Sequence, residues 1–336
     1  MDLSIIIVNF NSATFTINCI DSIVGSNMRM KYEIIVVDNA SDVHDEEKIR
    51  KRFPSVNWIQ TGYNAGFARA NNAGIRASKG DCILLLNADT IVKNNSIDKV
   101  YHQFSSQEKY IACGVQLLNE DGTHQHSGAK FIKGGANILL PLPYLGKMIK
   151  SLAQIFQVKQ PNVFSVNKDE DVDWIIGAFI LTKRVYIEKA GMLDEDFFMY
   201  AEEIEWCSRL RKFGPMVLFA NADIIHLGGG SSSNYYNMKQ YDNSRDIWSK
   251  KARQIIVSQM LRVRKQWGIF WYLFNLFAYY IEIPIFGIGF LLESLFRAKN
   301  KDFEFSQFAG FAKNMILSLP FFMDILLNRH KFYKVN

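Results

Sequence analysis

Polar side chains that could bind a cation or a nucleotide follow three apolar segments in the first third of the chain. The clusters are Asn9-Phe10-Asn11, Asp38-Asn39-Ala40-Ser41 and Asn87-Ala88-Asp89. A carboxylate such as Asp89 can hold Mg²⁺ or Mn²⁺ against a diphosphate, because hard cations take oxygen ligands and often bind through one or two carboxylates plus substrate phosphates. The structural alternative is an aspartate that forms a turn or caps the next helix.

Two further features of this region are suited to a nucleotide. Asp38 could read the edge of a base, and an Asx-turn with Ser41 as a helix N-cap is the structural alternative. Asn64-Ala65-Gly66 opens a predicted helix that contains Asn71, and a helix N-terminus after glycine suits an anion or a nucleotide. The sequence has no GxGxxG motif, which disfavours a nicotinamide-dependent enzyme.

An acidic cluster later in the chain could supply a general base. Glu202, Glu203 and Glu205 open a predicted helix that ends in basic residues. A carboxylate beside a diphosphate site can take a proton from an acceptor hydroxyl. Glu202 and Glu205 share a face of this helix, whereas Glu203 is rotated away from them. The alternative is complementarity to the helix dipole, with acids first and bases last.

His226 is a candidate ligand for a metal or a phosphate. It ends an apolar segment and precedes the Gly/Ser tract 228–233, whose backbone N–H groups could close over a diphosphate. A single histidine is more often structural. Because His226 lies at a strand end next to glycines, we favour a role as a metal or phosphate ligand over a structural role.

The elements that must position these residues alternate between strand and helix. Apolar strands are predicted at 3–8, 33–37, 56–60 and 82–86, with helices near 14–25, 44–53, 67–78 and 94–106. This order predicts βαβ units and a parallel sheet, and ligands of such sheets bind beyond the carboxyl ends of the strands. The polar clusters should therefore meet at one edge.

The segment 111–240 is less regular. We predict a hairpin around the turn 119–122, a loop over 134–170, a strand at 173–182 and a short strand at 216–219. Helices are predicted near 184–190 and 202–213.

The last hundred or so residues differ in composition from the rest of the chain. A basic segment, 250–265, precedes the strongly apolar 267–296, which only Glu282, Pro284 and Glu293 interrupt; a shorter apolar stretch covers 315–327. We predict a helical tail on or partly inserted in a membrane, because basic flanks match anionic cytoplasmic lipid. A helical cap packed on the sheet is the alternative. The basic residues border an apolar segment rather than line a groove, so the net charge of +6 does not indicate nucleic acid.

The amino-acid composition restricts the class of protein and the compartment in which we expect it. Hydrophobic residues make up 49% and charged residues 21%, which is typical of a globular protein and not of a disordered one. The four cysteines show no CxxC spacing, which argues against a zinc ribbon or a disulfide scaffold and favours a reducing compartment. The first apolar run is too short for a signal peptide, so we expect the protein in the cytoplasm.

Seven segments in order resemble the family-2 glycosyltransferases of the GT-A fold, and most of all their rhamnosyltransferase-like branch in bacterial cell-surface polysaccharide synthesis. They are SIIIVNFNS, EIIVVDNAS, NAGFARANNAGI, GDCILLLNADT, DVDWIIGAFILTKR, FFMYAEEIEWCSRLRKFG and IIHLGGGSSS. The resemblance covers about residues 1–235. It implies an α/β fold with a Rossmann-like, mostly parallel sheet over 1–240, of which 1–120 would bind the nucleotide and 121–240 the acceptor. The helical, membrane-associated tail would be 241–336.

The resemblance also implies an inverting, Mg²⁺- or Mn²⁺-dependent transfer from a nucleoside diphosphate sugar. Asp89 would be the metal ligand at the family's DxD position, with His226 as a second metal or diphosphate contact. Glu203 would be the catalytic base, with Glu202 and Glu205 as competitors. The nucleotide site would comprise Asn9, Asn11, Asp38, Asn64, Gly66, Asn71, Asn87 and Asp89, and the acceptor side Trp174, Gly177 and Glu202.

Departures from the family pattern refine this expectation. Asn87 replaces the first aspartate of DxD, and glutamate replaces aspartate at the base position. The QxxRW signature of processive synthases is absent, so we predict addition of a single sugar. The resemblance favours dTDP-rhamnose as donor, then UDP-sugars, and the tail favours a polyprenyl-diphosphate-linked glycan acceptor at the cytoplasmic face of the inner membrane. A nucleotidyltransferase and an inactive membrane scaffold are the alternatives.

Overall fold

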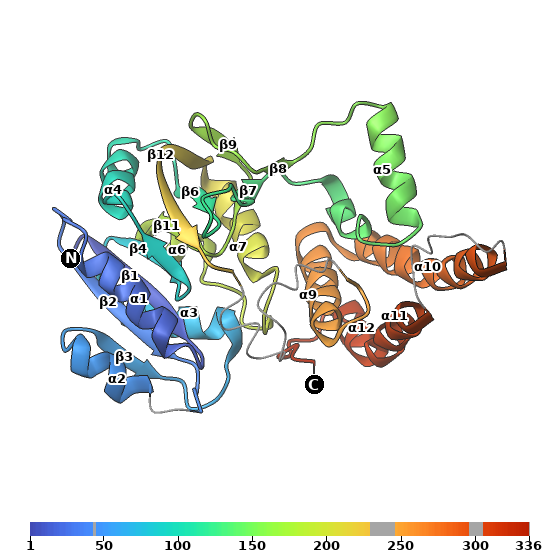
Figure 1. The fold of residues 1–336 in the computed structure, drawn as a ribbon, viewed down its shortest axis with the longest axis horizontal. Helices are drawn as coiled ribbons and strands as arrows, with labels where there is room; N and C mark the ends of the chain where they lie inside the picture. The colour runs from blue at the N-terminus through green and yellow to red at the C-terminus, as the bar shows by residue number, and fades with distance from the viewer. Residues whose placement is uncertain (43–44, 229–245, 296–304, 336) are drawn as a thin grey trace. The chain divides into compact units, whose positions relative to one another are not determined.

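The structure, a computed structural model, describes residues 1–42, 45–228, 246–295 and 305–335 (Figure 1). Residues 229–233 of the predicted Gly/Ser tract and residue 44 of a predicted helix lie outside the described residues. The chain forms two compact units. Unit 1 comprises 1–130, 162–198 and 202–242, and unit 2 comprises 131–161, 199–201 and 243–336.

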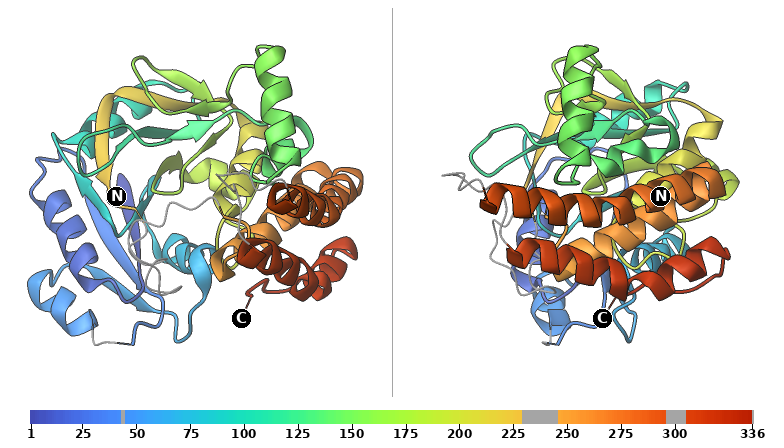
Figure 2. Two further views of the ribbon diagram at one scale, coloured as in Figure 1. Left: turned by 45° about the vertical axis from the view of Figure 1, so that its right-hand side comes forward. Right: turned by 90° about the vertical axis from the view of Figure 1, so that its right-hand side faces the viewer.

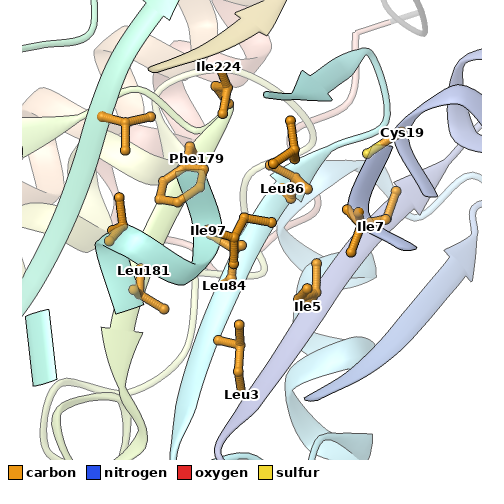
Figure 3. Packing of buried hydrophobic residues seen from close by; sticks show 14 of the residues in the cluster. Leu3, Ile5, Ile7, Cys19, Leu84, Leu86, Ile97, Phe179, Leu181 and Ile224 are labelled. Carbon is orange, nitrogen blue, oxygen red and sulfur yellow. The ribbon is translucent and has the colours of Figure 1, made fainter. Parts of the chain in front are cut away.

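The sheet of unit 1 begins with four parallel strands, as predicted. They are β1 (Leu3–Asn9), β2 (Tyr32–Asp38), β3 (Asn57–Gln60) and β4 (Cys82–Asn87), in the order β3-β2-β1-β4. The central strands are apolar and β-branched at nearly every position because both of their faces are covered. Figure 3 shows Leu3, Ile5 and Ile7 of β1 beside Leu84 and Leu86 of β4, all within one buried cluster.

The predicted helices of this half are also present. They are α1 (Ala13–Val24), α2 (Asp45–Arg52), α3 (Gly66–Ala77) and α4 (Ser96–Ser106). The buried face of α1 carries Thr16, Cys19, Ile20 and Ile23, at the three- and four-residue spacing of an amphipathic helix.

The rest of the main sheet is mixed. Strand β11 (Phe179–Lys183) lies antiparallel between β4 and β6 (Ala112–Leu118), and β12 (Met216–His226) runs parallel to β6. Two short strands complete it: β5 (Thr90–Val92) and β9 (Glu170–Val172) both pair antiparallel with β12. The expected mostly parallel α/β sheet is therefore confirmed, with antiparallel strands in its second half.

Two sequence predictions in this half need correction. The strand predicted over 173–182 is two strands, because β10 (Trp174–Ile175) leaves the main sheet to pair with β7 (Gly128–Ala129), which in turn pairs with β8 (Asn162–Val163). The strand predicted at 216–219 continues to His226 through a shift in register between Phe219 and Asp223. Irregular pairing of this kind depends on neighbouring strands and leaves no local pattern. Two helices lie where they were predicted: α6 (Arg184–Ala190) and α7 (Glu202–Leu210), which η2 (Arg211–Phe213) extends.

Unit 2 is helical. It contains η1 (Lys133–Leu139), α5 (Leu145–Ile155), α9 (Lys250–Trp267), α10 (Ile269–Leu295), α11 (Phe305–Leu317) and α12 (Leu319–Leu326). The loop predicted over 134–170 is wrong, because this segment holds α5. Glycines and prolines before and after the helix suggested a loop, but they only bound it.

Helix α10 is long and apolar enough to cross a membrane, by length and composition alone. It continues through Pro284. Helices α11 and α12 pass the same test only as a pair, and they are bent by 44° at their junction.

Candidate active site at the carboxyl edge of the sheet

Asn9 and Asp38 are paired residues at the ends of β1 and β2, as the parallel register requires. The amide nitrogen of Asn9 donates to Asp38 Oδ1 (2.7 Å) and Asp45 Oδ2 (3.1 Å). Its oxygen accepts from Thr16 Oγ1 at 2.7 Å. The Asn9 side chain is fully buried and holds two strand ends and the start of two helices together. A nucleotide contact by Asn9 stays a prediction.

The carboxylate of Asp38 is held in a turn. Its Oδ1 accepts from Ser41 Oγ at 2.6 Å, and its Oδ2 accepts from the Ser41 backbone N–H at 3.1 Å. The Asp38 carboxylate thus forms a local turn like the one that the sequence offered as the alternative, but it bonds the N–H three residues on rather than two. Asn11 makes a similar link across the same edge, because its oxygen accepts from the Asp42 N–H at 2.7 Å. Contacts of Asp38 with the base and of Asn11 with the nucleotide stay predictions.

Asn39 connects this edge to the start of α3, a function that the sequence analysis missed. Its Oδ1 accepts from the Ala65 N–H (2.7 Å), and its Nδ2 donates to Asn64 Oδ1 (3.1 Å). Asn64 Oδ1 also accepts from the Gly66 N–H. The N–H groups that open α3 are therefore bound to protein oxygens, and an anion would have to displace them. The position of Asn39 in a polar cluster at a strand end was the signal that could have identified it.

Gly66 is required where α3 begins. Its φ is +72°, and a Cβ at this position would lie 2.1 Å from the Phe198 carbonyl oxygen. The next N–H, of Phe67, donates to that same oxygen at 2.9 Å. Asn71 is buried, and its amide donates to the Phe67 carbonyl one turn earlier. Gly66 and the Phe67 N–H thus hold the start of α3 against the segment before the acidic cluster, and the Asn71 amide braces the first turn of the helix.

Asp89 and His226 meet where β5 pairs with β12. The register places His226 opposite Thr90, and the Leu227 N–H donates to the Asp89 carbonyl at 2.9 Å. His226 Nε2 lies 3.5 Å from Asp89 Oδ1 and 3.4 Å from Asn87 Nδ2. Asp89 is buried, with 8% of the residue exposed. The structure therefore brings together the predicted metal ligands and Asn87 of the DxD position.

Gln125 determines which nitrogen of His226 carries the proton. Its Nε2 donates to the His226 carbonyl (2.6 Å) and to Asn119 Oδ1 (2.7 Å), so its Oε1 must be the acceptor that lies 3.0 Å from His226 Nδ1. A hydrogen on Nδ1 is the assignment that satisfies this network. The Nε2 atom then lies between the Asn87 amide nitrogen (3.4 Å), which can donate to it, and Asp89 Oδ1 (3.5 Å).

This pair fits a divalent cation. Carboxylate oxygen and neutral imidazole nitrogen are both metal ligands, and a hydrogen bond from the other imidazole nitrogen is their usual support. Among the described residues no group of three or more His, Cys, Asp or Glu side chains could hold a metal ion. Two protein ligands suffice where diphosphate oxygens complete the coordination.

The three glutamates of α7 have different surroundings. Glu205 is buried and forms a bidentate ion pair with Arg209, with Oε2 2.8 Å from Nη2. Arg209 also donates to the Ala190 carbonyl at 2.7 Å, which fixes the pair. Glu202 is buried with 3% exposed, whereas Glu203 is half-buried. The Glu205 carboxylate is already engaged by Arg209 and directed toward that guanidinium, so the geometry favours Glu203 over Glu205.

Glu203 lies against Gly177 and α3. A Cβ built on Gly177 would be 3.6 Å from both Glu203 Cγ and Phe67 Cζ, so a predicted acceptor-side residue is next to the predicted base. Trp174, predicted on the acceptor side, is 8% exposed and packs edge-on against His126. Its burial leaves little of the ring for an acceptor.

Hydrogen bonds and an ion pair from side chains of α3 hold the loop that precedes α7. Asn72 donates to the Leu193 carbonyl and to Glu195 Oε1, and Arg76 pairs with the same Glu195 oxygen at 3.0 Å. Partial burial raises the pKa of Glu195, but the hydrogen bonds from Asn72 and Arg76 outweigh it, and the pKa lies below its usual value.

Comparison with known proteins gives a consistent result. The sequence model of the family described as "Glycosyl transferase family 2" matches residues 4–185. A hexosyltransferase of low-salt glycan biosynthesis from Haloferax volcanii is 27% identical over 303 residues, which are 85% of this chain and 89% of its own. An N-acetylglucosaminyl-diphospho-decaprenol L-rhamnosyltransferase of Mycobacterium tuberculosis is 24% identical over 208 residues, 57% of this chain and 66% of its own.

Solved structures share the fold. A mannosyltransferase of Pyrobaculum calidifontis, solved with GDP-Man and Mn²⁺, superimposes with a TM-score of 0.51 at 13% identity. The match covers 97% of this chain and 84% of that one. At this identity the likeness is one of fold, and it agrees with the sheet described above.

Proposed function

Because the chain belongs to glycosyl transferase family 2, we propose that it transfers a single sugar from a nucleoside diphosphate sugar to a hydroxyl of a lipid-linked glycan, with inversion at the anomeric carbon. The observation that carries this proposal is the Asp89–His226 pair at the carboxyl edge of the sheet, with His226 Nδ1 bonded to Gln125 and Nε2 on the side of Asp89. The family match sets aside the nucleotidyltransferase alternative.

Asp89 and His226 would hold Mg²⁺ or Mn²⁺, which when bound neutralises the charge that develops on the leaving diphosphate. Glu203, half-buried beside Gly177, accepts the proton of the acceptor hydroxyl. The acceptor oxygen forms a bond to the anomeric carbon as the bond to the diphosphate oxygen breaks. Attack from the face opposite the leaving group inverts the configuration.

The nucleotide would lie over the ends of β1, β2 and β4. Asp38 would contact the base, Asn9, Asn11 and Asn64 would shape the surrounding loops, and Asn87 would lie beside the diphosphate. Gly66 would support this site by fixing the start of α3, and Asn71 by bracing the first turn of that helix. Gly177 and Glu202 would border the acceptor, together with the small part of Trp174 that is exposed. The Asn39 amide joins two of these loops.

The donor and acceptor follow from the relatives. The mycobacterial enzyme is by name a rhamnosyltransferase that acts on a decaprenyl-diphosphate-linked sugar. We infer that this chain uses dTDP-rhamnose, or failing that a UDP-sugar, and a polyprenyl-diphosphate-linked glycan. Helix α10 and the basic segment before it would hold the protein at the cytoplasmic face of the cell membrane.

A donor screen tests this proposal. Purified full-length protein is incubated with Mg²⁺ or Mn²⁺, a panel of nucleotide sugars and a membrane lipid extract, and release of nucleoside diphosphate is followed. Release from one donor that depends on lipid, and that a chelator and Asp89→Ala both abolish, is the expected result. Folded, detergent-solubilised protein that releases nothing from any donor would contradict it and favour an inactive scaffold.

A further inference from the structure

The polar and apolar faces of α10 are inverted relative to a helix of a water-soluble bundle. Its buried stripe carries Asn275 and Glu282 together with the Tyr272 and Tyr279 rings. Its exposed stripe is apolar along the whole helix and comprises Phe270, Leu273, Phe274, Phe277, Ile281, Ile288, Leu291, Leu292 and Leu295. An exposed apolar stripe of this length indicates that the outer face contacts something other than water.

Helix α5 presents a second exposed apolar face. Met148, Leu152 and Ile155 recur at helical spacing, and Phe156 follows them. Ile155 is 72% exposed and Phe156 74%, which are high values for side chains of this size. Three lysines accompany this segment: Lys147, Lys150 and Lys159. Apolar side chains on one face of a helix with lysines on the other are typical of helices that lie in a membrane interface.

Buried contacts join α5 to α10 within unit 2. The Glu282 carboxylate accepts from the backbone N–H of Tyr144 (2.6 Å) and of Leu145 (3.1 Å), which caps the start of α5. The Tyr144 hydroxyl donates to Glu293 at 2.8 Å. A Cβ on Gly289 would lie 2.3 Å from the Tyr144 ring, so glycine is needed there. Figure 2 (right) shows α5 in green and α10 in orange.

We propose that α5 and the exposed stripe of α10 together form a docking surface for an anionic lipid bilayer, with α5 in the headgroup region. The inference rests on the membrane location included in the proposed function, and it adds a docking element from the middle of the chain. The occupant is lipid because the apolar face is bordered by lysines, which complement anionic headgroups. Glu282 is the positioning residue that holds the two helices as one surface.

A fluorescent probe on α5 tests its depth directly. The four native cysteines are buried, so a label directed to Ile155→Cys reacts selectively at that site. Val185→Cys, on exposed α6 of unit 1, is the matched control. With vesicles that contain phosphatidylglycerol, the label at 155 is expected to shift to the blue and to be quenched by brominated lipid, whereas the label at 185 does neither. Vesicle-bound protein whose label at 155 stays accessible to aqueous iodide would overturn the proposal.

The lysines provide a second, independent test. Removing Lys150 and Lys159 together, each as Lys→Gln, is expected to weaken partition onto anionic vesicles by about fivefold for each charge, and to leave binding to phosphatidylcholine unchanged. The double variant Lys48→Gln, Lys51→Gln removes two exposed charges from α2 of unit 1. Equal losses in both double variants would reflect net charge alone and would count against docking through α5.

A second copy of the chain is the other occupant that this surface could take. If the Ile155→Ser, Phe156→Ser variant dissociates an oligomer in sedimentation velocity while its vesicle binding is unchanged, the surface joins two chains and the lipid proposal fails. These readouts are independent of sugar transfer. If the donor screen fails, the vesicle and sedimentation results can therefore still be interpreted. If the vesicle tests fail, the proposed sugar transfer is not affected.

Discussion

Glu203 and Glu205 lie two residues apart on α7, yet the structure gives them different surroundings. The Glu205 carboxylate is buried in a bidentate pair with Arg209, whereas Glu203 lies half-buried against Gly177. Their spacing puts them on different faces of the helix, so one can support the fold while the other faces the site. The first prediction compares these two residues.

We expect Glu203→Gln to lower transfer by about 10²–10⁴-fold, because it removes the proton acceptor without changing side-chain volume. Its thermal midpoint should match the native protein. Glu205→Gln should instead lower stability by about 1–3 kcal/mol, since a buried ion-pair partner is lost. Transfer assays and thermal melts on both variants distinguish the two. A Glu203→Gln protein with native turnover would exclude Glu203 as the base.

Gln125 acts on His226 through the nitrogen that does not face Asp89. Gln125→Ala removes the acceptor of the Nδ1 hydrogen, so we expect Mn²⁺ affinity in the presence of nucleoside diphosphate to fall by about 10–100-fold. The tautomer can be followed separately through the ¹⁵N shifts of the imidazole. Gln103→Ala, which removes a surface bond to Asp169, is the control. Unchanged affinity together with an unchanged tautomer would show that Gln125 is not needed.

At the scale of elements, α3 is the part that joins the two sides of the site. Its start is bound by Asn39 and by the Phe198 carbonyl, and its middle by the loop that carries Glu195. Displacing α3 would move both the nucleotide loops and the residues that lead into α7. The stability of this junction should therefore depend on the charge of Glu195.

The pKa of Glu195 is lower in the folded protein than in the unfolded chain, so the stabilisation is present above the unfolded value and is lost as pH falls through the folded value. We expect the stability difference between the native protein and Glu195→Gln to be largest near neutral pH and to shrink between about pH 5 and pH 3. Urea unfolding midpoints across this range measure it. A difference that is independent of pH would show that the charge contributes nothing.

At the scale of the whole molecule, the two units differ in what they bury. Unit 1 buries apolar strands in its core and gathers polar side chains, themselves largely buried, at the carboxyl ends of β1, β2 and β4. Unit 2 buries Asn275 and Glu282 and exposes phenylalanine and leucine. The four cysteines are buried, and burial raises the pKa of the Cys82 thiol to about 11, which makes it unreactive at neutral pH.

The sequence by itself determined the first half of the sheet, its helices, and the strand ends that carry Asp38, Asp89 and His226. Such features follow from the apolar pattern of each segment and from the polar residues that end it, which are local properties of the chain. The same holds for the family resemblance, because it rests on short ordered segments. The choice of Glu203 as the base rests on this resemblance alone, because the charge order of its helix equally fits the helix dipole.

Only the tertiary structure decided which polar groups meet. Gln125 and His226 are about a hundred residues apart, and their hydrogen bonds depend on how β12 pairs with its neighbours. Likewise, the sequence analysis predicted a loop where α5 lies, and the attachment of α5 to α10 through Glu282 is visible only in the structure. Hydrogen bonds between distant segments depend on the packing of the intervening chain, and no local pattern records that packing.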